Sequence, residues 1–263
     1  FAFCDSLQTV DSLKEAGKGA FWNCRSLTKI EMAGVESIGN CAFGRTRIQA
    51  IDVSPKYIGD YAFIDCKDLT KESIKGAPII GRNILFDCDS VSEMSVSGKD
   101  KIRWYFGKSP DKLMKLTVSG DICDDFCRNC QTLKDLVLKD VERFGRWCFY
   151  NNCSLSDIHL DNVKTIGDWA FAYCDSISTI TLPDTTGYIG MNAFRYCNGL
   201  KTITIESDKP IEFGANSFYS THPDKSFFVH ENLIDQYLGM KIWGEYASAI
   251  KIMKREHAPE DNN

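Results

Sequence analysis

The 263-residue sequence lacks several features that would place it in a common functional class. It has no long basic run and a net charge of −5, so we expect no nucleic-acid partner. No apolar run approaches the roughly 18 residues of a membrane-spanning helix, so we expect no direct membrane insertion by this segment. A Gly-rich phosphate loop, a nucleophile elbow and a zinc-protease motif are also missing. We therefore expect no catalytic residues and no cofactor.

Histidine is scarce, with four in the chain. One of them, His159, alternates with Asp157 and Asp161, a pattern that could suggest a metal site. Residues four apart on a strand are separated by roughly 13 Å, which is too far for two ligands of one ion. We interpret the three side chains as a solvated sheet face and expect no metal.

The sequence does contain an internal repeat that runs through most of its length. Phe171 has counterparts 20 to 23 residues apart, with one interval of 42 that spans two repeats. The matching positions are Phe1, Phe21, Phe43, Phe63, Leu85, Cys127, Phe149, Phe171 and Phe194. Because one repeat cannot bury its own apolar side, the chain should stack its repeats into a solenoid.

Each repeat has two halves. The first, Ile166-Gly167-x-x-Ala170-Phe171-x-x-Cys174, spaces its small and apolar residues like a helical turn. The glycine is expected to permit a tight turn, at positive φ. The second half, Ile177-x-x-Ile180-x-Leu182, ends in the alternation of a half-buried strand and matches the leucine-rich repeat pattern L-x-x-L-x-L.

The first half resembles more narrowly the BspA-like leucine-rich repeats of bacterial and protist surface proteins. The resemblance implies an α/β solenoid, a right-handed superhelix with a parallel β-sheet on its concave face and short helical turns on its convex face. About ten repeats would occupy residues 1–226. The chain begins at Phe1, inside a repeat, so we expect the natural protein to continue upstream.

The end of the chain departs from the repeat and predicts a cap over residues 227–252. Phe227-Phe228-Val229 should be the last strand. Residues 232–250 carry apolar side chains at helical spacing, which predicts an amphipathic helix with Asn232 as its N-cap. Such a helix would cover the open end of the solenoid. The polar tail, residues 253–263, should be disordered.

Two internal departures also carry expectations. Glu72 falls where an apolar strand residue belongs, so that strand should bulge or shift. Residues 98–110 lack the repeat signature and carry Trp104, Tyr105 and Phe106, which should form an irregular coil with aromatic side chains in the core.

The 12 cysteines follow the repeat. We interpret eight of them as a structural ladder of buried thiols: Cys4, Cys24, Cys66, Cys88, Cys130, Cys153, Cys174 and Cys197. Disulfides are the alternative that a surface location would suggest. Cys123, Cys127 and Cys130 have the spacing of an iron–sulfur signature, so a redox or iron–sulfur enzyme is a remote alternative.

The outward strand residues are the candidate binding site. We expect them on the concave face, at Glu93, Lys115, Asp135, Asp157, His159, Thr179, Thr181, Thr202 and Thr204. This face has mixed charge, and it lacks the aromatic platforms that are typical of glycan sites. It favours a non-enzymatic protein-binding module, which we expect to be monomeric. The family resemblance implies an extracellular or cell-surface location and adhesion to a host matrix or cell-surface protein; a structural spacer that displays another domain is the alternative.

Overall fold

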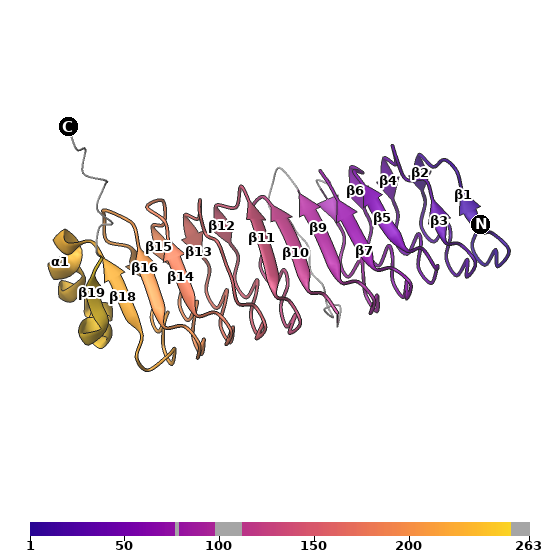
Figure 1. Ribbon diagram of the computed structural model, residues 1–263. Helices are drawn as coiled ribbons and strands as arrows, with labels where there is room; N and C mark the ends of the chain where they lie inside the picture. The colour runs from indigo at the N-terminus through magenta and orange to yellow at the C-terminus, as the bar shows by residue number, and fades with distance from the viewer. Residues whose placement is uncertain (77–78, 98–111, 254–263) are drawn as a thin grey trace, which may run out of the picture.

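The computed structural model describes residues 1–76, 79–97 and 112–253 and shows a solenoid of short parallel strands. The first and last coils lie at opposite ends of a rod (Figure 1). The strands at the L-x-x-L-x-L half of each repeat, with those of the C-terminal cap, form what we call the strand face. They are β1 (Thr9–Val10), β3 (Lys29–Ile30), β5 (Ala50–Val53), β7 (Lys71–Ile74), β9 (Glu93–Ser97), β10 (Lys115–Ser119), β11 (Asp135–Lys139), β14 (Thr179–Leu182), β16 (Thr202–Ile205), β18 (Ser226–Val229) and β19 (Ile250–Ile252).

Two-residue strands form a second wall of the solenoid. They immediately precede the repeat glycines, or the residue at the same position, and pair in parallel from coil to coil. They are β2 (Glu15–Ala16), β4 (Ser37–Ile38), β6 (Tyr57–Ile58), β8 (Ile79–Ile80), β12 (Arg143–Phe144), β13 (Thr165–Ile166), β15 (Tyr188–Ile189) and β17 (Glu212–Phe213). The two sets of strands confirm the predicted leucine-rich repeat solenoid.

The third wall, which we call the turn side, consists of consecutive turns, and the described residues before position 231 form no helix. Backbone bonds join these turns from coil to coil. The Phe171 amide donates to the Ala193 carbonyl at 2.8 Å, and the Tyr173 amide donates to the Arg195 carbonyl at 2.9 Å. This wall is therefore hydrogen-bonded along the rod, as the strand walls are.

The repeated phenylalanines fill the centre, as predicted. Phe171 is fully buried, and its ring stacks between those of Phe149 at 5.5 Å and Phe194 at 5.4 Å. Phe21, Phe43 and Phe63 form a similar stack near the N-terminus. The stacked rings join neighbouring coils through one continuous core.

The repeat glycines are needed for a different reason than the one predicted. Positive φ occurs at Gly19, Gly34, Gly76 and Gly120, and Gly167 is not among them. A Cβ atom on Gly167 would lie 2.7 Å from the backbone carbon of the glycine one coil earlier. The glycines allow close contact between coils rather than a left-handed turn.

Glu72 does not cause the predicted bulge. It keeps its place in β7, paired in register with Ile51 on one side and Met94 on the other. Its side chain is buried, and neither carboxyl oxygen has a hydrogen-bond partner among the residues that the structure describes. Burial, and secondarily the charge of Asp52, raises the pKa of Glu72 well above its ordinary value. The uncharged form allows the carboxyl group to occupy an apolar position.

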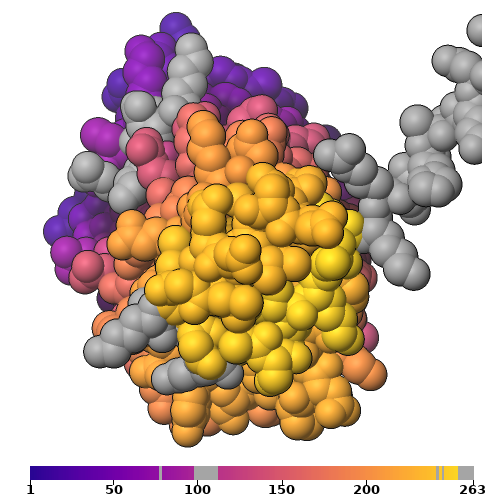
Figure 2. Space-filling model, turned by 90° about the vertical axis from the view of Figure 1, so that its left-hand side faces the viewer, coloured from indigo at the N-terminus to yellow at the C-terminus, as the bar shows by residue number. Residues whose placement is uncertain are grey.

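The C-terminal cap covers the end of the rod but differs in detail from the prediction (Figure 2). The single helix is replaced by three short pieces: η1 (Glu231–Leu233), α1 (Ile234–Gly239) and η2 (Lys241–Ala249). Asn232 lies inside η1 and is not an N-cap. Ile250, expected in the helix, begins β19, which pairs with β18 and is the last strand.

Aromatic side chains hold this cap in place. Trp243 is buried, 4.7 Å from the ring of Phe213 and 5.1 Å from that of Phe227. The Tyr237 hydroxyl accepts the Ile211 amide at 3.2 Å. The predicted aromatic coil at 98–110 and nearly all of the predicted tail lie outside the described residues.

Candidate functional site

The nine predicted binding residues all lie on the strand face and point away from the core. Seven are exposed, and Thr202 and Thr204 are half-buried. The sheet brings them into rows: Glu93 aligns with Lys115, which aligns with Asp135. In the last coils, Thr179 pairs with Thr202 and Thr181 pairs with Thr204.

Charge is distributed unevenly along this face. In the earlier coils, acidic residues are paired across strands: Lys71 lies 3.3 Å from Glu93, and Lys75 lies 2.8 Å from Asp52. Farther along, Asp135, Asp157, Asp161 and Glu206 are exposed and have no cation within salt-bridge distance among the described residues. This part of the strand face is therefore uncompensated negative charge.

The acidic stretch coincides with a break in the sheet. Residues 157–160 form no strand, and one isolated bridge, between Asp135 and Asp157, connects them to β11. No strand pairing connects them to β14. Their apolar side chains nevertheless stay in the core: Ile158 is 7% exposed and Leu160 2%. The coil is held from inside while its outer hydrogen bonds are lost.

Proline explains part of this break. Lys75 and Glu206 donate their amides to the preceding coil, to Val53 and Leu182 respectively. Pro183 holds the same position after β14 and has no amide hydrogen to donate. The carbonyl that it would reach, on Leu160, accepts the Val163 amide at 3.0 Å instead. One bond of the ladder between these two coils is therefore lost to the proline.

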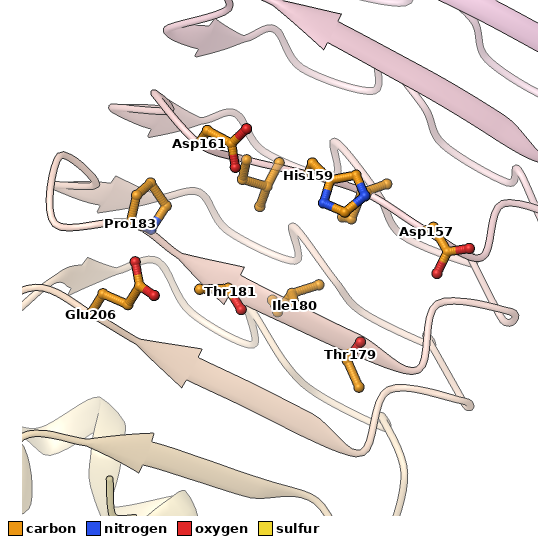
Figure 3. A pocket seen from close by; sticks show the side chains of 10 residues that line it. Asp157, His159, Asp161, Thr179, Ile180, Thr181, Pro183 and Glu206 are labelled. Carbon is orange, nitrogen blue, oxygen red and sulfur yellow. The ribbon is translucent and has the colours of Figure 1, made fainter. Parts of the chain in front are cut away.

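The break leaves a hollow of about 410 Å³ between residues 157–161 and β14. Figure 3 shows Asp161, Pro183 and Glu206 at one end, His159 and Thr181 in the middle, and Asp157 and Thr179 at the other end. We call this the acidic groove. Its carboxylates and hydroxyls suit cationic and hydrogen-bonding groups. Among the described residues, no three His, Cys, Asp or Glu side chains are placed to hold one metal ion.

The sequence placed Asp157, His159, Thr179 and Thr181 in this region, but as part of a regular and continuous concave face. It missed Pro183 and Glu206 as groove residues. The available signal was a proline directly after the strand pattern that ends at Leu182.

The cysteine ladder is present in most coils. Each thiol donates to the carbonyl of the aromatic residue one coil earlier: Cys88 to Phe63 at 3.0 Å, and Cys197 to Phe171 at 3.0 Å. Cys24, Cys66 and Cys174 make the same contact. Burial raises the pKa of Cys197 to about 12, so this thiol stays protonated and unreactive.

Three ladder predictions need correction. Cys4 is half-buried rather than buried. Cys153 is only half-buried, because Asn152 occupies the interior position and donates to the Cys127 carbonyl at 2.8 Å. Cys130 is buried but forms a disulfide with Cys127. The remaining ten cysteines belong to no disulfide.

That disulfide also bears on the remote iron–sulfur reading. Cys127 and Cys130 would each have to supply a thiolate to a cluster, and they are bonded to each other. Cys123 is half-buried nearby and belongs to no disulfide. The three residues therefore form one disulfide, with Cys123 outside it, rather than three thiolates.

Sequence comparison gives one family match and no curated relative. The family model described as a BspA type leucine-rich repeat region matches in six copies, over residues 1–106 and 120–238. No curated protein matches the chain significantly. None of the helices in the described part of the chain is long and apolar enough to cross a membrane.

Several solved structures are similar. A leucine-rich repeat protein from Bacteroides ovatus is 21% identical, with 95% of this chain and 85% of that chain covered and a TM-score of 0.46. The pneumococcal vaccine antigen PcpA is 16% identical, with 94% and 78% covered and a TM-score of 0.46. A leucine-rich cell surface protein from Faecalibacterium prausnitzii is 18% identical, with 79% and 82% covered and a TM-score of 0.39. At these identities the likeness says nothing about ligands.

Proposed function

The chain belongs to the BspA-type leucine-rich repeat family, and from this premise we propose that it is a non-enzymatic protein-binding module. Its partner contacts the strand face around the acidic groove. The observation that carries this proposal is the coincidence of uncompensated carboxylates with the hollow at the break in the sheet. Fold alone does not fix a function, so the proposal depends on this site.

The chemistry of the groove favours a particular kind of partner. Asp157, Asp161 and Glu206 lie around a hollow wide enough for one or two side chains. Lysine or arginine side chains of a partner would gain charge-assisted hydrogen bonds there. The regular strand face on either side offers an extended, rigid surface for the rest of the contact. Such binding should weaken with added salt.

We further propose an extracellular or cell-surface location, with adhesion to a host matrix or cell-surface protein as the role. The family resemblance supports this, and one similar structure carries the words cell surface in its name. The Cys127–Cys130 disulfide is consistent with an oxidising compartment. In this setting the chain would act as a monomer that presents one binding face.

A double charge reversal tests the proposal. Asp135→Lys with Asp157→Lys should weaken binding to any matrix or cell-surface protein that an array identifies, by at least about tenfold, or roughly 1.4 kcal/mol. The matched control is Asp5→Lys with Asp11→Lys, which makes the same charge change on exposed residues near the N-terminus. Circular dichroism checks folding in each variant.

Two results would count against the proposal. Unchanged affinity in the Asp135 and Asp157 variant would remove the strand face as the site. If the array yields no protein partner at all, the spacer alternative is favoured, because a spacer needs a rigid rod but no ligand.

A further inference from the structure

A band of aromatic side chains crosses the turn side over four coils. It consists of Trp147, Tyr150, Trp169, Tyr173, Tyr196 and Tyr219, and we call it the aromatic band. The first five are half-buried, and Tyr219 is 47% exposed. The interior phenylalanines already fill the core of these coils, so the aromatic band is not needed to complete it.

The rings of the aromatic band stand against one another along the rod. Trp147 and Trp169 stack at 4.8 Å with only 5° between their planes, and Tyr173 lies 4.8 Å from Tyr196. Among these rings only the two tryptophans stack face to face, and the other neighbouring pairs meet tilted or edge to face, at 34° to 86°. Ring edges carry the positive end of the aromatic quadrupole, and Tyr and Trp add O–H and N–H donors there.

The backbone under the aromatic band is unusual for such large residues. Trp147, Trp169, Tyr173 and Tyr196 all have positive φ, between 58° and 61°. Bulky residues rarely adopt this conformation, which favours Asn, Asp and Gly. Many other coils follow the preference at the same two positions, with Asn83, Asp125, Asn192 and Asn216 at the first and Asn23, Asp65, Asp87, Asn129 and Asn151 at the second, whereas Cys41 and Tyr61 at the first and Phe3, Arg45 and Ser220 at the second do not. The large rings are kept where folding alone favours small polar residues, which points to a functional reason.

Arg195 adds a fixed cation to the aromatic band. Its guanidinium lies 4.8 Å from the rings of Tyr196 and Tyr219 and 5.6 Å from that of Trp169. It donates to the Asn192 side-chain oxygen at 3.0 Å and to the Tyr196 hydroxyl at 3.1 Å. No carboxylate of the described residues lies within salt-bridge distance of it.

The other arginines near the aromatic band already have carboxylate partners. Arg128 lies 4.9 Å from the Trp147 ring and pairs with Asp125 at 3.3 Å. Arg146 pairs with Asp168 at 3.6 Å. Arg195, in contrast, has no carboxylate partner among the described residues, so a carboxylate of a partner can balance its charge.

We propose that the aromatic band binds an acidic segment of a partner protein, with a carboxylate of that segment on Arg195. Trp, Tyr and Arg are the residues that most often dominate protein–protein binding energy. The alternative of a glycan is disfavoured, because sugar rings stack on exposed aromatic faces, whereas the Trp147 and Trp169 faces cover each other and the guanidinium groups of Arg128 and Arg195 lie over rings of the band. This inference rests on the proposed protein-binding function. It adds a second contact surface, away from the acidic groove, that binds acidic rather than basic groups.

Selection from a displayed library of random 12-residue peptides on the full chain provides the test. We expect enriched peptides that are rich in Asp and Glu. Their affinity should fall at least about tenfold in Trp169→Asn with Tyr196→Asn, and in Arg195→Gln. The asparagine variants match Asn192 and Asn151 of neighbouring coils, so they should fold as well as the parent chain. A purely structural role for the rings predicts lower stability instead.

Tyr61→Asn is the matched control, because Tyr61 has φ 56° and 36% exposure but lies outside the aromatic band. It should leave peptide affinity unchanged. Failure to enrich acidic peptides, or acidic peptides that bind the aromatic-band variants as tightly as the parent, would overturn the inference. The affinity of the same peptides is also measured on the Asp135 and Asp157 double variant, where we expect no change. An unchanged affinity would show that the aromatic band binds independently of the strand face, so the failure of one site would not remove the other.

Discussion

Two stretches of the strand face obey the same repeat and differ in their outer bonds. Over β7, β9, β10 and β11 the backbone ladder is continuous, and Lys71 pairs with Glu93 across it. Between residues 157–160 and β14 the ladder is lost, and the acidic groove opens. Whatever holds a coil in its place in the stack must therefore be common to both stretches.

The buried apolar side chains are common to both stretches. Leu155, Ile158 and Leu160 stay buried in the coil whose outer strand is unpaired. The turns of that coil also remain bonded to the next, with the Phe149 amide 2.8 Å from the Ala170 carbonyl. Apolar packing and the turn side hold the coil in place, so the strand face can open there without disrupting the stack.

The strongest test of this comparison is Phe171→Ala, beside the acidic groove. Phe171 is fully buried between two stacked rings, so its removal should lower the free energy of unfolding by about 3–5 kcal/mol. Thr181→Ala, on the outer side of the same region, should change it by no more than about 0.5 kcal/mol. Denaturant unfolding measures both. Similar losses in the two variants would mean that the strand face matters as much as the core.

Glu72→Met tests the core beneath the continuous stretch of the strand face, because Glu72 lies in β7. Glu72 is a buried carboxyl without a hydrogen-bond partner among the described residues, and Met94 holds the equivalent position one coil later. The substitution should raise the free energy of unfolding at neutral pH by about 1–3 kcal/mol. Chemical denaturation at pH 7 gives the measurement. A loss of stability would mean that the carboxyl has a stabilising role that its surroundings do not reveal.

The gain should depend on pH in a defined direction. Burial raises the pKa of Glu72 in the folded chain, so the unfolded chain releases its proton first as pH rises. Stability associated with Glu72 is therefore present below its ordinary pKa and is lost from there up to the raised value. The benefit of Glu72→Met should shrink as pH falls from 7 to 4, and a constant benefit would contradict this titration.

Much of the fold could be predicted from the sequence because one pattern recurs in nearly every coil. Ring positions such as Phe171 and Phe43 and the parallel strands follow from that pattern, and the cap follows from the point at which the pattern ends. The outward positions of the nine candidate residues follow from strand alternation. Because each position of the pattern recurs in many coils, the sequence indicates which strand residues face the core and which face outward.

Features that belong to one coil could not be predicted in the same way. Glu72 fits its strand because burial changes its protonation, which a pattern of apolar letters does not include. The cap helix ends at Gly239, and the chain returns to the sheet as β19, which pairs with β18. The acidic groove lies at a break to which one missing amide, at Pro183, contributes, and the aromatic band depends on residues that oppose the local backbone preference.

Pro183→Ser is the finest test, since its expected effect on stability is the smallest. Ser97 and Ser119 hold the equivalent position in β9 and β10, where the ladder is continuous. A serine amide can reach the Leu160 carbonyl, a bond that contributes about 0.5–1.5 kcal/mol. The loss of proline rigidity in the unfolded chain costs about 0.4–1 kcal/mol, so the two changes nearly cancel.

The decisive measurement is therefore local rather than global. We expect the amide of residue 183, and that of Thr181 beside it, to become protected from hydrogen exchange, because closing the ladder brings residues 157–161 against β14. The acidic groove should narrow, and binding that depends on Asp157 should weaken even though the carboxylates are intact. If the new amide exchanges freely and the groove keeps its shape, then proline is not what opens the sheet. The turn bond from Val163 to Leu160 would then be the feature that separates the two stretches of the strand face.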